Sequence, residues 1–92
     1  MEFEWDSEKS RFNKIKHDVS FEEAIAVWEN IHMEVRNLAH SEDTEKRSAT
    51  MGWIGKKLYV VIWTKRKNKI RIISVRRARE REEAIFFKKV QE

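Results

Sequence analysis

The first apolar and polar residues of the chain follow a strand-like spacing and then a helix-like one. Residues Glu2–Trp5 alternate between polar and apolar side chains, which predicts a short strand. A helix is predicted next over Lys9–Lys16, with an N-cap at Asp6 or Ser7. The apolar content of this helix is thin, since it consists of Phe12 and Ile15.

A second helix begins at a clear N-terminal motif. Ser20 is suited to be its N-cap, and Glu23, three residues later, completes a capping box. The helix is expected to close at Asn30. Apolar residues recur between these limits at helical spacing and form a stripe that we expect to be buried, consisting of Phe21, Ala24, Ile25, Val27 and Trp28.

Strand-like patterns dominate the chain from residue 31 to residue 75. Strands are predicted over Ile31–Leu38, Glu45–Ile54, Leu58–Thr64 and Ile70–Val75, and the polar residues 39–44 are expected to form a loop. The segment Leu58–Thr64 is apolar on both faces and rich in β-branched and aromatic residues, which is typical of a central strand.

Short turns and a final helix complete the pattern. Gly55-Lys56 predicts one turn, and Lys65–Lys69 predicts a charged hairpin turn in which Asn68 is expected to be left-handed. Ala78–Val90 predicts a charged amphipathic helix. Together these elements predict one α+β domain over residues 1–92. Its antiparallel meander sheet has four to five strands, with two N-terminal helices and one C-terminal helix packed on it.

The composition narrows the class of protein. The absence of cysteine excludes disulfides, thiolate zinc sites and cysteine nucleophiles. The three histidines lack metal-ligand spacing, so we expect neither a metal site nor a cofactor. No apolar run is long enough to span a membrane, and the acidic first ten residues do not resemble a signal peptide. A soluble cytoplasmic protein is therefore expected.

The net charge of +4 hides a strong asymmetry along the chain. Residues 65–81 contain nine basic residues and one acidic residue, a net charge of +8, whereas the rest of the chain carries −4. A segment this basic inside a folded domain produces a concentrated positive field. Polyanions are its natural partners, and nucleic acid is the first candidate.

One group of candidate functional residues lies on the first predicted helix. Lys9, Asn13 and Lys16 are spaced so that they share one face, and His17 lies beside them at the helix end. A helix C-terminus favours cations, which gives Lys16 and His17 a structural reason to be there. The functional interpretation is a cationic cluster in which histidine transfers a proton to or from RNA.

Two further groups lie on predicted strands. Glu45 and Arg47 point to the same side of a strand, either as a surface ion pair or as a general base beside a phosphate clamp. In the strand from Ile70, strict alternation places Arg76 on the same face as Ile70, and Arg71 and Arg77 on the other. Arginines between β-branched residues usually bind a carboxylate or a phosphate, so both partners are open alternatives here.

The tryptophans contribute one candidate for base stacking. Trp28 and Trp63 lie in apolar patterns and are expected in the core. Trp53 lies near a turn and is the one fair stacking candidate.

Three groups of these residues, taken in order, resemble the BrnT toxin family of type II toxin–antitoxin systems. The first group spans residues 3–6, Lys9, Asn13, Lys16-His17 and residues 19–24. The second consists of His40-Ser41, Glu45, Arg47 and Gly52. The third comprises Leu58, Val60-Val61, Thr64, Arg66, residues 71–74, Arg76, Ala78 and an acid at Glu82 or Glu83. The resemblance covers nearly the whole chain.

The resemblance implies a RelE-like fold and an endoribonuclease whose RNA cleavage arrests translation and growth. It also implies inhibition by a BrnA-like antitoxin that carries a ribbon-helix-helix DNA-binding part. A heterotetramer built on an antitoxin dimer is the expected assembly. Without its antitoxin the toxin itself is not expected to bind DNA.

On this basis we expect a metal-independent reaction in which the ribose 2′-OH attacks the adjacent phosphate. Arg76 and Arg47 are the expected phosphate clamps, and His17 or Glu45 is the proton acceptor. Lys16 serves as an electrostatic helper or acid. Other contacts to the RNA are expected from Arg66, Arg71, Arg77, Lys9 and Trp53.

Two alternatives stay open at the level of sequence. The same basic strand and helix suit a nucleic-acid-binding module without catalysis, which would retard RNA but leave its length unchanged. They also suit a protein-interaction domain whose basic sheet docks an acidic partner. If that partner is the antitoxin, it is expected to cover the region of Arg71 and Arg76.

Overall fold

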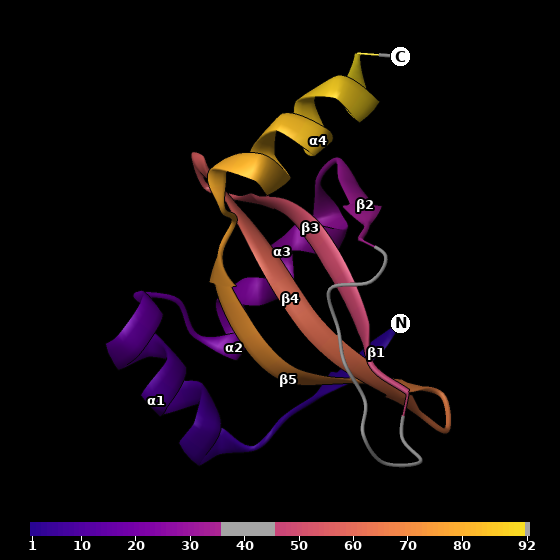
Figure 1. Ribbon diagram of the computed structural model, residues 1–92. Helices are drawn as coiled ribbons and strands as arrows, with labels where there is room; N and C mark the ends of the chain where they lie inside the picture. Colours follow the sequence, from indigo (N-terminus) through magenta and orange to yellow (C-terminus); the bar gives the residue numbers. More distant parts are fainter. Residues whose placement is uncertain (36–45, 92) are drawn as a thin grey trace.

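A computed structural model describes residues 1–35 and 46–91 and confirms the α+β class (Figure 1). One five-stranded sheet has the order β1-β5-β4-β3-β2. The elements are β1 (Glu2–Glu4), α1 (Ser7–His17), α2 (Phe21–Ala24), α3 (Ala26–Glu29), β2 (His32–Glu34), β3 (Ser48–Ile54), β4 (Lys57–Arg66), β5 (Lys69–Arg77) and α4 (Glu80–Val90). Among the described residues, no helix is long and apolar enough to cross a membrane.

The antiparallel meander is confirmed for β2 through β5, but β1 departs from it. β1 pairs in parallel with β5 at the edge of the sheet, in a register that places Glu2 beside Lys69 and Glu4 beside Arg71. Oε2 of Glu4 lies 3.0 Å from Nη1 of Arg71. This register brings each acidic residue of β1 beside a basic residue of β5, which favours the pairing.

The predicted second helix is divided into two short helices. The capping box is confirmed, because Ser20 Oγ accepts from the Glu23 N–H while Oε1 of Glu23 accepts from the Ser20 N–H. The helix is then interrupted at Ile25, whose N–H donates to the carbonyl of Glu22, three residues back. Bonds of this tighter type break an α-helix locally. Ala24 of α2 and Val27 of α3 are both buried in the core.

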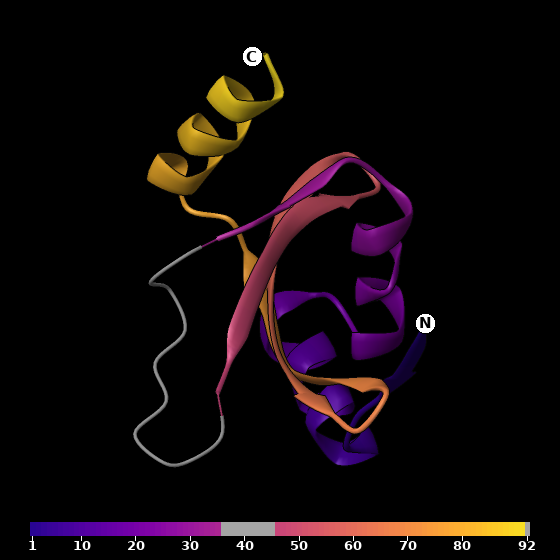
Figure 2. The ribbon, with the colours of Figure 1, turned by 90° about the vertical axis from the view of Figure 1, so that its right-hand side faces the viewer.

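Each face of the sheet has its own hydrophobic core. We call the side of α1, α2 and α3 the helix-covered face and the other side the open face; Figure 2 shows the sheet nearly edge on between them. The helix-covered core consists of Val19, Phe21, Ala24, Val27, Tyr59, Val61, Ile70, Ile72 and Val75. The open-face core is smaller and consists of Ala49, Met51, Leu58, Val60 and Phe86.

A β-bulge in β5 changes the predicted distribution of its side chains. Trp63 of β4 pairs with Ile72, but the preceding Ile62 pairs with Ser74, so Ile73 is an extra residue on β5. The strict alternation predicted for β5 is therefore wrong beyond residue 72. Val75, rather than Ser74, joins Ile72 in the helix-covered core.

The bulge also places two arginines together on one face. Arg71 pairs with Thr64 and Arg76 pairs with Val60, and the register assigns both pairs to the open face. The prediction that Arg71 and Arg76 lie on opposite faces is therefore wrong. Arg77 lies on the helix-covered face instead, with its Cζ atom 5.8 Å from the centre of the Tyr59 ring.

The two hairpin turns have left-handed residues at their tips. Gly55 has a φ of 63°, as expected for the turn between β3 and β4. In the next hairpin the positive φ falls on Lys67, at 55°, rather than on Asn68. The loop between the paired residues Arg66 and Lys69 has two residues, and such loops commonly require a positive φ at the first one.

Buried polar side chains hold α1 in place. Asn13 is only 8% exposed; its Nδ2 donates to the Val19 carbonyl at 2.8 Å, and its Oδ1 accepts from the Val75 N–H at 3.3 Å. Ser10 Oγ accepts from the Phe21 N–H at 2.9 Å. α1 is thereby joined both to the start of α2 and to the edge of β5.

α4 is attached to the open face by aromatic side chains and by an ion pair. Phe86 is buried against the open-face core and packs edge-on against Trp53. Nη1 and Nη2 of Arg76 each donate to Glu82 at 2.8 Å, and Glu82 also accepts from the Arg79 N–H at 2.7 Å. The far end of α4 extends beyond the sheet in Figure 1.

We expect Asn13→Ala to lower the free energy of unfolding by about 2–4 kcal/mol, because it leaves two buried backbone groups without partners. Urea unfolding followed by circular dichroism measures the change. Arg11→Ala, at an exposed position of the same helix, is the control and should alter stability by less than about 0.5 kcal/mol. Equal stability of the two variants would contradict the anchoring role of Asn13.

A second expectation concerns how the ion pair between Arg76 and Glu82 makes the stability of the protein depend on pH. The hydrogen bonds from Arg76 lower the pKa of the Glu82 carboxyl below its value in the unfolded chain. The stability from this pair is therefore fully present above the unfolded pKa of 4.5 and is lost as the pH falls through the lower pKa of the folded protein. Glu82→Gln should lower the free energy of unfolding by about 1–3 kcal/mol near neutral pH.

The deficit of the Glu82→Gln variant should shrink in acid, where the carboxyl of the original protein is also neutral. Denaturant unfolding at a series of pH values measures this. Glu83→Gln, in the same turn of α4, is the matched control. A deficit of Glu82→Gln that stays constant from neutral to acid pH would contradict the assignment.

Candidate functional site

Basic residues form a row along the open face of the sheet. The strand register assigns Arg66, Lys69, Arg71 and Arg76 to this face. Arg47 precedes β3 and is exposed. The carbonyl of its neighbour Lys46 accepts a hydrogen bond from Oγ1 of Thr64, and Thr64 pairs with Arg71 in the sheet. Three of the arginines predicted to contact RNA, namely Arg66, Arg71 and Arg76, therefore belong to one side of the molecule.

Two of these arginines are already bound to carboxylates. Arg71 is paired with Glu4, and Arg76 is held by both oxygens of Glu82. The hydrogen bonds from Arg76 account for the lowered pKa of Glu82, and those to Glu82 raise the pKa of Arg76. Because a strand rises roughly 3.3 Å per residue, the two guanidinium groups belong to positions roughly 15 Å apart. Each of the two arginines is held by a carboxylate of its own.

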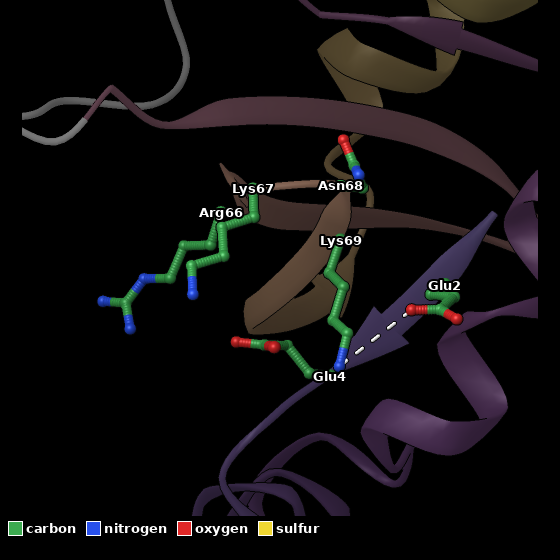
Figure 3. Close-up of a pocket in the computed structure, with 6 residues that line it drawn as sticks. All are labelled: Glu2, Glu4, Arg66, Lys67, Asn68 and Lys69. Carbon is green, nitrogen blue, oxygen red and sulfur yellow. Dashed lines mark ion pairs between the residues drawn. The ribbon is translucent and has the colours of Figure 1, made fainter.

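A mixed-charge cavity of about 470 Å³ lies at the hairpin end of this row (Figure 3). Its lining consists of Glu2, Glu4, Arg66, Lys67, Asn68 and Lys69. Nζ of Lys69 lies 4.0 Å from Oε2 of Glu2, and Figure 3 shows the two side chains directed toward each other. An anion entering this cavity meets carboxylates as well as cations.

A second cavity, of about 300 Å³, lies between α1 and β5 and is called the α1–β5 cleft here. It contains three of the predicted site residues, because Lys9, Lys16 and His17 all line it. Lys9, Asn13 and Lys16, which are predicted from their spacing to share one helix face, thus line the cleft together, with His17 beside them. The remaining lining residues are Phe12, Ile15, Phe21, Ile73 and Ser74.

The basic residues of the α1–β5 cleft lack the carboxylate partners that Arg71 and Arg76 have on the open face. Within residues 1–35 and 46–91, the side chains of Lys9, Lys16 and His17 form neither a hydrogen bond nor an ion pair with one another or with other described residues. Lys14, by contrast, is paired with Glu23 at 2.9 Å. The cleft therefore presents cationic groups that are not neutralised by a described carboxylate.

Ser74 connects the two neighbourhoods. It lines the α1–β5 cleft and, through its pairing with Ile62, belongs to the open face between Arg71 and Arg76. The predicted residues of the cleft and of the open face thus lie along one path around the edge of β5, and they do not form a single pocket. The sequence pattern did not single out Ser74, because its position depends on the bulge at Ile73.

The other predicted residues lie apart from this path or outside the described ranges. Arg77 packs over Tyr59 on the helix-covered face. Trp53 packs against two rings of α4, with ring centres 6.0 Å from Phe86 and 6.1 Å from Phe87. Glu45 lies outside the described residues, so its position relative to Arg47 stays a prediction.

Two residues that sequence reasoning did not select as functional have defined places near the site. Glu82 binds Arg76, although the sequence left the acid open between Glu82 and Glu83. Phe12 lines the α1–β5 cleft between the two lysines, and its helical spacing from them was a signal that could have found it. Within the described ranges, no three His, Asp or Glu side chains form a metal-binding group.

Comparisons with known proteins bear on what this surface does. Residues 5–82 match the family described as the ribonuclease toxin BrnT of type II toxin–antitoxin systems. No curated protein matched the sequence. The family match includes α1, the whole of β5 and the Arg76–Glu82 pair, and it confirms the resemblance found in the sequence. The chain therefore belongs to the BrnT family of type II toxin–antitoxin ribonuclease toxins.

Proposed function

We propose that this toxin is a metal-independent endoribonuclease that cleaves RNA in the α1–β5 cleft, with His17 as the proton acceptor. The observation that carries the proposal is the gathering of Lys9, Lys16 and His17 in one cavity, without described partners, in a chain of a ribonuclease toxin family. Imidazole is suited to proton transfer near neutral pH.

The two lysines supply the electrostatic part of this proposal. Lys9 and Lys16 are seven residues apart on α1 and line the same cavity as His17. An RNA phosphate between them would gain charge-assisted contacts. These contacts strengthen as negative charge develops on the phosphate oxygens during the reaction.

The reaction forms one bond and breaks another at the same phosphorus. The ribose 2′-oxygen attacks the adjacent phosphorus while its proton passes to the unprotonated nitrogen of His17. The bond from phosphorus to the 5′-oxygen breaks, and that oxygen takes a proton from Lys16 or from water. The products are a 2′,3′-cyclic phosphate and a free 5′-OH, and no metal ion takes part.

The arginine row is proposed to extend the RNA path beyond the cleft. Ser74 joins the cleft to the face that carries Arg71 and Arg76. A phosphate would have to compete with Glu4 for Arg71 and with Glu82 for Arg76. Arg66 and Arg47 complete the path, and Arg76 in particular also positions α4.

The family also suggests which protein binds and inhibits this toxin. A type II toxin has an antitoxin, and we propose a BrnA-like protein with a ribbon-helix-helix DNA-binding part, assembled with the toxin as a heterotetramer. It would inhibit by covering the basic path around β5. DNA binding would then come from the antitoxin, and cleavage of cytoplasmic RNA by free toxin would arrest growth.

His17→Gln tests the proton transfer. We expect its cleavage rate on a short RNA to fall by about 10²–10⁴-fold, with RNA binding unchanged. Gel electrophoresis measures cleavage, and mass spectrometry identifies the cyclic phosphate end. His32→Gln, on β2 and outside the cleft lining, is the matched control. Full activity of His17→Gln would exclude His17, and retention of uncut RNA by the unaltered protein would favour a binding module.

Removal of divalent metal ions tests whether the reaction is independent of metal. Excess EDTA should leave the cleavage rate of the purified toxin unchanged, because the proposed reaction draws its positive charge from side chains. A metal-dependent ribonuclease treated in the same way is the control. Loss of activity that returns on adding Mg²⁺ would contradict metal independence.

A further inference from the structure

α1 turns polar side chains toward the protein interior and apolar side chains toward solvent. Ser10 and Asn13 are buried, whereas Phe12 is 71% exposed and Ile15 is 82% exposed. A surface helix normally turns its apolar side chains toward the core. Here the helix is anchored by Ser10 Oγ, which accepts a hydrogen bond, and by the Asn13 amide, which donates one, so packing in the core does not account for the two apolar side chains.

Phe12 lies beside the cations of the α1–β5 cleft. It follows Lys9 by three residues and precedes Lys16 by four, so the ring lies between the two lysines on one helix face. All three residues line the cleft with His17. An exposed aromatic ring is thus placed directly beside groups that suit a phosphate.

The charge around the ring favours an anionic occupant. Lys9, Arg11 and Lys16 flank the exposed face of α1, and Glu8 is the acidic residue among them. A ligand that is both planar and anionic matches a ring set between ammonium groups. A nucleotide has this combination, because its base stacks on aromatic rings while its phosphate binds cations.

We propose that Phe12 stacks on an unpaired base of the RNA, next to the phosphate bound by Lys9 and Lys16. The inference rests on the proposed function and specifies its substrate as single-stranded RNA. In a duplex each base already stacks on its neighbours and is not available to a side chain. Phe12 and Ile15 alone offer far less apolar area than the roughly 800 Å² per partner of a stable protein interface.

Binding of an uncleavable RNA tests this stacking. The probe is a short single-stranded oligoribonucleotide with 2′-O-methyl groups and one 2-aminopurine, whose fluorescence falls when it stacks. Phe12→Leu keeps an apolar side chain without a ring, and we expect it to weaken binding about tenfold and abolish the quenching. Phe12→Trp keeps a ring and should bind at least as tightly as the original protein.

Two controls separate stacking from a structural effect. An oligonucleotide with an abasic site in place of 2-aminopurine should bind equally to the Phe12→Leu variant and to the original protein. The dependence of binding on salt should also be unchanged in Phe12→Leu, because the phosphate contacts remain. Ile15→Ala, on the same exposed surface, should retain the quenching.

Equal affinity and quenching in Phe12→Leu and the original protein would overturn the inference, as would failure of the original protein to bind the probe. Loss of antitoxin binding in Phe12→Leu with RNA binding unchanged would show a protein-docking surface and overturn it too. The proposed catalytic role is read separately, from cleavage by His17→Gln. That variant should still quench the uncleavable probe, so the two proposals can fail independently.

Discussion

The arrangement of this toxin depends on the two hydrogen bonds of the Asn13 side chain. One end of its amide binds the carbonyl of Val19, and the other binds the N–H of Val75 on β5. Beyond the three residues that pair with β1, the outer edge of β5 lacks a neighbouring strand among those described, and Asn13 satisfies one of its donors. Because this polar contact fixes α1 beside β5, the cleft between them exists and the outer face of the helix is free to carry Phe12.

Carboxylates control how much of the positive charge is accessible. Glu4 and Glu82 come from β1 and α4, the first and last elements of the chain, and each binds an arginine of β5. The most basic segment of the sequence is therefore partly neutralised within the fold. Lys9 and Lys16 of α1 lie outside that segment and have no described carboxylate partner in the cleft, so the charge distribution in space differs from that along the sequence.

Local features of the fold could be predicted from sequence, whereas long-range ones could not. The capping box at Ser20 depends on residues three apart, and the shared face of Lys9 and Lys16 depends on helical spacing alone. The bulge at Ile73 and the parallel pairing of β1 depend on residues brought together by the rest of the chain. Sequence spacing therefore predicted that Lys9 and Lys16 share one face of α1, but it did not predict which carboxylates bind the arginines.

The extra residue at Ile73 has a consequence for the lengths that β5 tolerates. One residue fewer at this point would remove the bulge and leave the other pairs in register, because Ile72 and Ser74 would then follow each other opposite Trp63 and Ile62. Arg76 would stay on the open face beside Glu82, and Val75 would stay in the helix-covered core. Loss of a single codon here would therefore straighten β5 without exchanging its charged and buried sides.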